Sequence, residues 1–207
     1  MISFAINGFG RIGRSATRVY LEKHTDKLNL LAINTTGSMT ASSWAHLRKY
    51  DTAYGILPYQ IEGEDLIDQK TLSTLKQDAS GYDPLIGYLK ITTARENFKI
   101  PVLAQRNPAL LPWTKYGVNV VVESTGAFTK AEQAKLHLDA GAKNVVISAP
   151  AKSEGVETVV LGVNDQIINK DHQNAISILS NGSCTTNCVA PVAAVMHAKL
   201  GVKKAML

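Results

Sequence analysis

The chain has 207 residues, enough for a domain with a substantial hydrophobic core, and its 45% apolar content is ordinary for a globular protein. The net charge of +5 comes from scattered Lys and Arg residues without charge runs or interleaved aromatic residues, so we expect no nucleic-acid partner. No apolar run is long enough to cross a bilayer and no cleavable leader precedes the first apolar stretch, so we expect no membrane partner and no targeting peptide.

The elements begin with an apolar run over residues 2–6, a glycine-rich turn and a helical pattern over residues 11–24. A second apolar run covers residues 28–33, which completes a strand–helix–strand unit of the size of a βαβ crossover. A second helix, capped by Ser42 or Ser43, is expected to follow.

Residues 56–98 interrupt this alternation with several glycine and proline residues. We expect a short helix within residues 65–76 and strands near residues 88–92 and 99–104. The region about 56–98 is therefore interpreted as an irregular insertion.

The alternation returns after residue 98. A helix is expected to begin at a capping box in which Thr129 caps and Glu132 reaches back, and to end at Gly141. Around this helix four more strands are predicted, over residues 118–122, 144–148, 159–163 and 175–179.

The last predicted helix runs from Cys184 to Leu200, with one apolar face and a stop signal at Gly201. Pro191 lies in its interior and should kink it, and a final strand is expected over residues 202–207. Helices that alternate with almost wholly apolar strands predict an α/β, Rossmann-type, doubly wound and mostly parallel sheet with helices on both faces.

The strongest motif is Gly8-Phe9-Gly10-Arg11-Ile12-Gly13, which follows the first strand and opens the first helix. Gly8 permits a tight turn, Gly10 lets a pyrophosphate approach the backbone, and Gly13 lets the helix pack close to the strand. Phosphates would then meet the free N–H groups of the helix N-terminus. Three glycines in register make an ordinary strand–helix turn the weaker explanation.

The second strand ends in Asn34-Thr35-Thr36, where NAD-binding folds usually carry an acid for the ribose 2′-hydroxyl. A carboxylate would repel a 2′-phosphate, whereas hydroxyl and amide groups could accept one. One hypothesis is that NADP is tolerated and even preferred. The alternative is that Asn34 only completes the strand and NAD binds with fewer contacts.

Cys184 stands at a predicted helix N-terminus, where unpaired N–H groups stabilise a thiolate, so we interpret it as reactive. Cys188 lies one turn further along and is interpreted as a buried structural cysteine. Side chains one turn apart point in parallel, which disfavours a disulfide between the two. Close cysteines without a leader are typical of a reducing compartment, so we expect a cytoplasmic protein.

The remaining candidates are interpreted as structural, and no histidine stands at metal-ligand spacing from the cysteines, so no metal site is expected. His197 would lie roughly 20 Å from Cys184 along a straight helix, too far to act as its base. The two tryptophans, Trp44 and Trp113, are expected in the core. The other four histidines are expected on the surface: His24, His46, His137 and His172.

Five segments together resemble phosphorylating glyceraldehyde-3-phosphate dehydrogenase. They occur in the family's order from one end of the chain to the other, which makes the combination more specific than any single motif. The matching segments are residues 6–14, 49–52, 121–126, 147–150 and 183–188.

The resemblance implies a role for each matching residue. Cys184 matches the nucleophile, and Ser183 and Thr185 match part of the substrate-phosphate pocket. Residues 105–108 resemble a segment that lies near the adenine. The implied cofactor-binding residues are Asn7, Gly8, Gly10, Arg11, Ile12, Gly13, Asn34, Thr35, Arg106, Ser124, Thr125, Gly126, Phe128 and Ser148.

The resemblance also implies the chemistry and the partners. NAD or NADP is the expected cofactor, and a sugar-phosphate aldehyde with inorganic phosphate the expected substrates. The thiolate adds to the aldehyde, hydride passes to the nicotinamide, and phosphate cleaves the resulting thioester to an acyl phosphate. A homo-oligomer is expected, because members of the family are tetramers.

Three features depart from the family pattern. Thr35 replaces the acid that usually follows the strand-ending asparagine, and the segment between Tyr54 and Phe98 is longer than usual. The chain also stops at Leu207, before the family's activating histidine, second phosphate pocket and substrate arginine. We therefore expect an incomplete portion with weak or no activity of its own.

Residues 1–183 are expected to form an NAD(P)-binding Rossmann domain, and residues 184–207 the first helix and strand of a truncated catalytic domain. An erythrose-4-phosphate-type dehydrogenase and a non-catalytic dinucleotide-binding module remain the alternatives. Titration with both cofactors and the coding sequence downstream of Leu207 would separate them.

Overall fold

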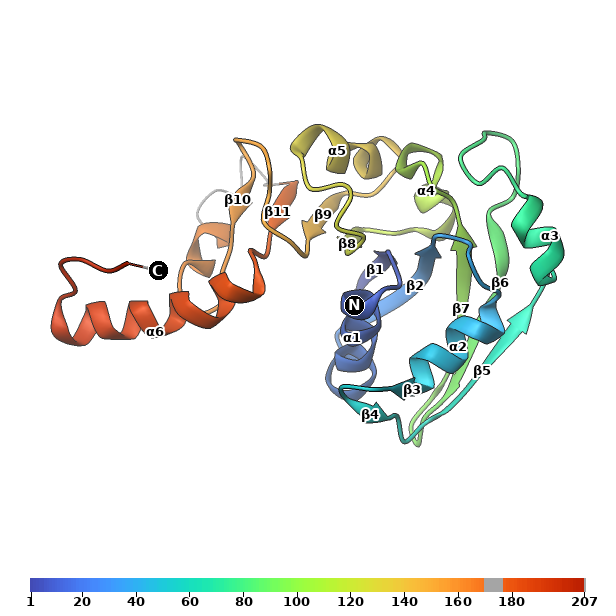
Figure 1. The fold of residues 1–207 in the computed structure, drawn as a ribbon, viewed down its shortest axis with the longest axis horizontal. Helices are drawn as coiled ribbons and strands as arrows, with labels where there is room; N and C mark the ends of the chain where they lie inside the picture. The colour runs from blue at the N-terminus through green and yellow to red at the C-terminus, as the bar shows by residue number, and fades with distance from the viewer. Residues whose placement is uncertain (170–176, 207) are drawn as a thin grey trace.

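One large, mostly parallel sheet organises the molecule in the computed structural model, which describes residues 1–169 and 177–206 (Figure 1). The strand order is β10-β11-β9-β8-β1-β2-β7-β6-β5. Neighbours from β10 to β7 pair in parallel, and β6 and β5 add antiparallel strands at one edge. The strands are β1 (Ile2–Asn7), β2 (Leu28–Thr35), β5 (Gln60–Asp65), β6 (Leu85–Thr92), β7 (Asn97–Ala104), β8 (Val120–Glu123), β9 (Asn144–Ile147), β10 (Glu157–Thr158) and β11 (Ile178–Ser180).

Helices cover both faces of this sheet (Figure 1). On one face lie α1 (Arg11–Val19), which continues as the π-helical turn Tyr20–His24, and α2 (Ala41–Lys49); α4 (Trp113–Tyr116) and α5 (Ala131–Asp139) lie on the other. The remaining elements are α3 (Gln69–Thr74), α6 (Cys184–Leu200), the 3-10 turns Pro108–Leu110 and Asp165–Asn169, and a separate hairpin of β3 (Tyr50–Asp51) and β4 (Gly55–Ile56).

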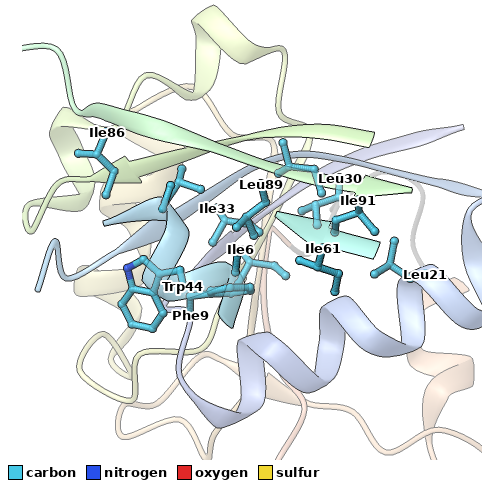
Figure 2. Close-up of a cluster of buried hydrophobic side chains, with 14 of the residues drawn as sticks. Ile6, Phe9, Leu21, Leu30, Ile33, Trp44, Ile61, Ile86, Leu89 and Ile91 are labelled. Atoms are coloured by element: carbon cyan, nitrogen blue, oxygen red, sulfur yellow. The ribbon is translucent and has the colours of Figure 1, made fainter. Parts of the chain in front are cut away.

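Successive residues of the central strands point to opposite faces, and both sets are buried. Along β1, Phe4 and Ile6 join the core beneath α1 and α2. Figure 2 shows Ile6 of this core together with Trp44. Ala5, between them, packs on the other side with Trp113. Burial on both faces explains why the strands read as nearly continuous apolar runs, and it confirms the doubly wound α/β class. Both tryptophans are core residues, as predicted.

The region 56–98 is largely part of the main sheet. The predicted short helix is α3 and the two predicted strands are β6 and β7, but β5 was not predicted. At Gly63 of β5 an added Cβ would lie 2.2 Å from the Cα atom of Ser42, so only glycine lets α2 approach this edge so closely. The description of the whole region as irregular is therefore wrong, because antiparallel pairing extends the sheet.

Several predicted boundaries shift. The N-cap of α2 is Thr40, so Ser42 and Ser43 lie inside its first turn. Gly141 and Gly201 follow α5 and α6 with φ of +104° and +70°, which confirms both as helix stops.

The predicted capping box of α5 is displaced by one residue: the Lys130 N–H donates to the Gln133 side chain at 3.2 Å. Residues 159–163 do not form the predicted strand, because the paired segment is β10, just before them. Residues 202–206 form no strand either. Ala175, the predicted start of the last sheet strand, lies outside the described residues.

α6 projects away from the sheet at the C-terminal end of the chain (Figure 1). None of its residues is buried, and the helix continues through Pro191. Across residues 1–169 and 177–206, no helix combines the length and the apolar character that a membrane span requires.

Candidate functional site

The loops that follow β1, β2, β7 and β8 meet at the carboxyl edge of the sheet. β1 lies between β2 and β8, so the direction in which the chain crosses the sheet reverses there. Ligands of doubly wound folds bind at such a switch point. A cavity of about 260 Å³ opens at this position, lined by Gly8, Asn34, Thr35, Thr36, Gln105, Arg106, Thr125, Ala127 and Phe128.

The glycine turn between β1 and α1 has a closed side and an open side. Gly8 adopts φ +98°, and an added Cβ would lie 2.7 Å from the backbone nitrogen of Thr125. A Cβ at Gly13 would lie 2.1 Å from the carbonyl oxygen of Gly8, so α1 packs directly on the turn. At Gly10, by contrast, nothing lies within 4 Å of an added Cβ. This open space is where a ligand can reach the backbone.

The first turn of α1 is suited to an anion. It contains no acidic residue, and its N-cap, Gly10, offers no side chain to the free N–H groups. Arg11 and Ile12 are exposed in this turn. Arg11 lines a second cavity of about 240 Å³ beside Asp51 and is not among the described residues that line the first cavity. The open turn and the acid-free helix start fit the pyrophosphate of a dinucleotide.

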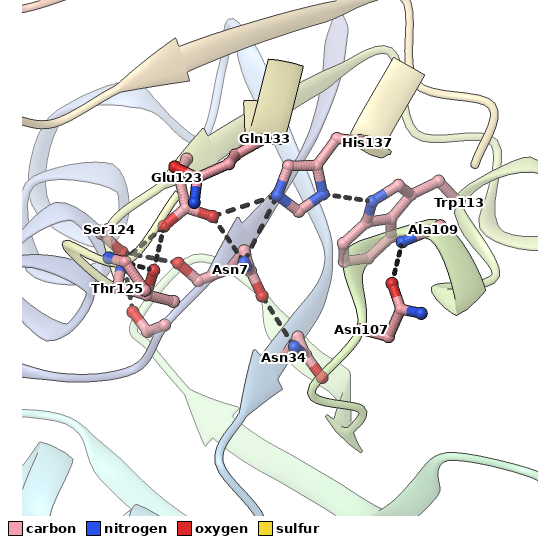
Figure 3. Close-up of polar contacts among 12 residues, drawn as sticks. Asn7, Asn34, Asn107, Ala109, Trp113, Glu123, Ser124, Thr125, Gln133 and His137 are labelled. Atoms are coloured by element: carbon pink, nitrogen blue, oxygen red, sulfur yellow. Dashed lines mark hydrogen bonds and ion pairs between the residues drawn. The ribbon is translucent and has the colours of Figure 1, made fainter. Parts of the chain in front are cut away.

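A buried polar network links the strand ends beneath the cavity (Figure 3). Asn7 Nδ2 donates to Glu123 Oε2 at 2.5 Å, and Asn34 Nδ2 donates to Asn7 Oδ1 at 2.7 Å. The backbone N–H of Gln105 donates to Asn34 Oδ1 at 2.9 Å. One chain of hydrogen bonds therefore holds the ends of β8, β1, β2 and β7 in register.

His137 of α5 extends this network, although it was predicted to lie on the surface. It is fully buried, and Trp113 Nε1, which can only donate, lies 3.0 Å from His137 Nδ1. The imidazole hydrogen is therefore on Nε2, which donates to Glu123 Oε2 at 3.0 Å. Glu123 Oε1 accepts from the Thr125 N–H at 2.8 Å and also from the Thr125 hydroxyl.

Glu123 and His137 are thus the supporting residues that the sequence analysis missed. A glutamate at the end of an otherwise apolar strand was the signal that could have indicated Glu123, because a buried carboxylate requires several donors. The signal for His137 was weaker: it stands between Leu136 and Leu138, and three residues after Ala134, which is buried.

The hydroxyl groups near the end of β2 have different surroundings. Thr35 is buried, and its Oγ1 donates to the Leu103 carbonyl at 3.0 Å. Thr36 is exposed, and its Oγ1 donates to Ser38 Oγ at 3.0 Å. Of the described residues that line the cavity, none carries a carboxylate and Arg106 carries a positive charge. The cavity is therefore electrostatically suited to an anionic ligand.

The other predicted cofactor residues surround the turn. Ser124 Oγ donates to the Gly8 carbonyl at 2.7 Å, and the Ser148 N–H donates to the Glu123 carbonyl at 2.9 Å. Gly126 adopts φ +76° with open space where a Cβ would stand. Of the predicted set, six residues line the cavity: Gly8, Asn34, Thr35, Arg106, Thr125 and Phe128.

Cys184 is the first residue of α6 and is exposed. Ser183 caps the helix, with its Oγ accepting the Thr186 N–H at 2.9 Å, and Thr185 is exposed. Cys188 is exposed as well, so its predicted burial is wrong, whereas both thiols are free as predicted. No residue of α6 is among the described residues that line the cavity, so the structure does not bring Cys184 to it.

Comparison with known proteins assigns the chain to a family. The family model described as glyceraldehyde 3-phosphate dehydrogenase, NAD binding domain, matches residues 2–82 and residues 65–131. The chain belongs to this family. The match is split into two segments that overlap at residues 65–82, the part of the chain that contains α3.

Members of the glyceraldehyde-3-phosphate dehydrogenase family are similar along the whole chain. Glyceraldehyde-3-phosphate dehydrogenase 1 of Bacillus cereus is 42% identical over 207 residues. The enzymes of Pseudomonas aeruginosa and Zymomonas mobilis are 40% and 42% identical over 207 and 209 residues. Each alignment covers 100% of this chain and 52% of the relative, so the chain spans about half the length of the curated relatives it matches.

Family membership agrees with the resemblance that the sequence motifs indicated. It does not by itself assign a function to individual side chains. Among residues 1–169 and 177–206, no group of three His, Cys, Asp or Glu side chains is placed to hold a metal ion.

Proposed function

We propose that this chain is the dinucleotide-binding portion of a glyceraldehyde-3-phosphate dehydrogenase and that its cofactor is NAD or NADP. The observation that carries the proposal is the open turn at Gly10, at the switch point between β1 and β8. The acid-free start of α1 would hold the pyrophosphate, and the cavity between the strand ends would hold the adenosine.

The residues of this turn would act mainly through their backbone. Asn7, Gly8, Gly10 and Gly13 shape the approach, while Arg11 and Ile12 contribute N–H groups of the first helical turn. Further cofactor contacts are proposed for Asn34, Thr35, Arg106, Ser124, Thr125, Gly126, Phe128 and Ser148.

The proposed reaction uses Cys184 as the nucleophile toward a sugar-phosphate aldehyde. Cys184 is the first residue of α6, and its neighbours Ser183 and Thr185 would contribute hydroxyl groups to a substrate-phosphate pocket. When bound, the nicotinamide supplies the hydride acceptor. Inorganic phosphate would release the acyl group, and we propose a cytoplasmic homo-oligomer as the working form of the whole protein.

Calorimetric titration of the chain with NAD and NADP tests the proposal. We expect wild type to bind at least one of them and Gly10→Val to weaken that binding at least about tenfold, or 1.4 kcal/mol. Because no protein atom lies within 4 Å of an added Cβ, the free energy of unfolding should fall by less than about 1 kcal/mol. Gly10→Ala should have a smaller effect on binding. Absence of binding of either cofactor to the folded wild-type chain would overturn the proposal.

A further inference from the structure

Residues 75–84, called here the 75–84 segment, follow α3 and lie against the carboxyl end of β7. The backbone N–H of Arg106 donates to the Gln77 carbonyl at 2.7 Å, and the Tyr82 hydroxyl donates to the Ala104 carbonyl. Burial raises the pKa of Tyr82 to about 12, so this hydroxyl remains a donor at neutral pH. The segment is therefore attached to the strand whose following loop lines the cavity.

Gln77 connects this segment to two of the cavity's loops at once. Its side chain is buried, with 8% exposed, and Nε2 donates to the Gly37 carbonyl at 3.1 Å. Oε1 accepts from Arg106 Nε at 3.0 Å. An added Cβ at Gly37 would lie 2.4 Å from Gln77 Nε2, so the amide is closely packed against the loop after β2. One side chain thus ties the loop after β2 to the loop after β7.

The bond to Gln77 uses only one edge of the Arg106 guanidinium. Arg106 is exposed and lines the cavity, and its Nη1 and Nη2 form no hydrogen bond with the part of the chain that the structure describes. A guanidinium is planar with its donors in a rigid fork, so anchoring Nε restricts the plane in which the free nitrogens lie. Arg106 is the one cationic residue in a cavity lining whose described residues include no carboxylate.

We propose that Gln77 is a specificity-determining positioning residue, which holds Arg106 so that its free nitrogens bind a phosphate on the ribose 2′-position of the dinucleotide. The inference rests on the proposed function and extends it to one cofactor, NADP. A guanidinium fork matches phosphate geometry, and charge-assisted hydrogen bonds are the strong ones. Thr36, also exposed in the cavity lining, could offer its hydroxyl hydrogen to the phosphate only by giving up its hydrogen bond to Ser38 Oγ.

The test is calorimetric titration of the full chain with NAD and NADP, and with the adenosine fragments AMP and adenosine 2′,5′-bisphosphate. The variants are Gln77→Met, which keeps the side-chain length but not its hydrogen bonds, Arg106→Met, and the two combined. Gln69→Met is the matched control, because Gln69 Nε2 also donates to the loop after β2, to the Ser38 carbonyl at 3.2 Å. Thermal unfolding of every variant verifies that it is folded.

We expect Gln77→Met to raise the Kd for NADP and the bisphosphate about tenfold, as loss of an orienting hydrogen bond to a charged group would. The Kd values for NAD and AMP should change by less than about threefold, as should all four values in the Gln69→Met control. The double variant should have the same ratio of NADP and NAD Kd values as Arg106→Met alone, because Gln77 acts through Arg106. If Gln77 had only a structural role, Gln77→Met would raise the Kd values of all four ligands by a similar factor.

An unchanged NADP-to-NAD ratio of Kd values in Gln77→Met would overturn the inference, as would additive effects in the double variant. If Gln77→Met does not fold, the exposed Arg106→Met variant decides, and an unaltered Kd for the bisphosphate contradicts the inference. Failure of the folded wild type to bind any of the four ligands would instead remove the proposed function, and this inference with it.

Discussion

Cys184 and Cys188 provide an internal comparison, because both thiols are free and exposed but only one begins a helix. We expect iodoacetamide to alkylate Cys184 faster, by roughly two- to fivefold, which matches the 0.3–1 kcal/mol effect of a helix N-terminus on a nearby negative charge. Mass spectrometry of the chain during the reaction gives both rates.

The single variants serve as controls. Cys188→Ser should retain the fast alkylation of Cys184, and Cys184→Ser should retain only the slow alkylation of Cys188. Equal rates at the two positions would contradict the interpretation of Cys184 as the activated thiol.

Arg48 of α2 is buried without full compensation. It is 2% exposed, and its Nε and Nη2 have no hydrogen-bond partner among the described residues. Burial, and next the proximity of Arg18, lowers the pKa of Arg48 to about 10. The folded state therefore holds a poorly solvated positive charge at neutral pH.

Arg48→Met should raise the free energy of unfolding by about 1–3 kcal/mol, because it removes this charge while keeping apolar contacts. Below about pH 9 the gain should be constant, since Arg48 is protonated in both the folded and unfolded states. Above pH 10 the unfolded state binds more protons, so wild-type stability rises with pH and the gain shrinks.

Urea unfolding of wild type and Arg48→Met at pH 7, at pH 9 and above pH 10 measures the difference in the free energy of unfolding in both pH ranges. The exposed Arg95→Met variant controls for the loss of one positive charge and should stay within about 0.5 kcal/mol of wild type. A less stable Arg48→Met protein would show that the guanidinium has a compensating partner, such as bound water.

At the scale of elements, Glu123 ties the end of β8 to three neighbours. Its Oε2 accepts from Asn7 of β1 and His137 of α5, and its Oε1 accepts from Thr125 in the loop that lines the cavity. The carboxylate is only 1% exposed, so each of these donors depends on it. Packing of α5 and the shape of the cavity are therefore linked through one side chain.

Glu123→Gln should lower the free energy of unfolding by about 2–3 kcal/mol, because an amide replaces one acceptor with a donor that faces other donors. Denaturant unfolding measures the loss, and cofactor titration should show weaker binding through the displaced Thr125 loop. Glu132→Gln, at an exposed position in the first turn of α5, is the control and should cost less than about 0.5 kcal/mol. Similar losses in both variants would contradict the role of the network.

At the scale of the whole molecule, α6 leaves an apolar stripe in solvent. Val192, Met196 and Leu200 are 59%, 47% and 77% exposed and follow one another at a spacing of four. Contiguous exposed apolar surface favours association. We expect the chain to self-associate as its concentration rises, and Val192→Glu to reduce this without lowering the melting temperature.

Sedimentation velocity over a range of concentrations measures the effect. Val19→Glu places the same charge on an exposed apolar residue of α1 and should leave association unchanged. Sedimentation of Val192→Glu identical to that of wild type would exclude α6 as the associating surface.

The glycine turn was predictable because its constraints act over a few residues. Gly8 needs a positive φ, and Gly13 must let the first turn of α1 pass beside the Gly8 carbonyl. The antiparallel edge was not predictable in the same way, because pairing of β5 with β6 joins segments separated by α3 and the 75–84 segment. Loop composition alone does not reveal that such segments pair.

The sequence by itself determined the alternation of strands and helices, the doubly wound class and the open turn at Gly10, because side-chain periodicity and backbone preference are local properties. Only the tertiary structure decided that His137 meets Glu123, that Gln77 holds Arg106, and that Arg48 is buried with unpaired nitrogens. Those outcomes depend on which strand ends become neighbours in the sheet, and distant residues acquire partners only when the chain closes around a shared core.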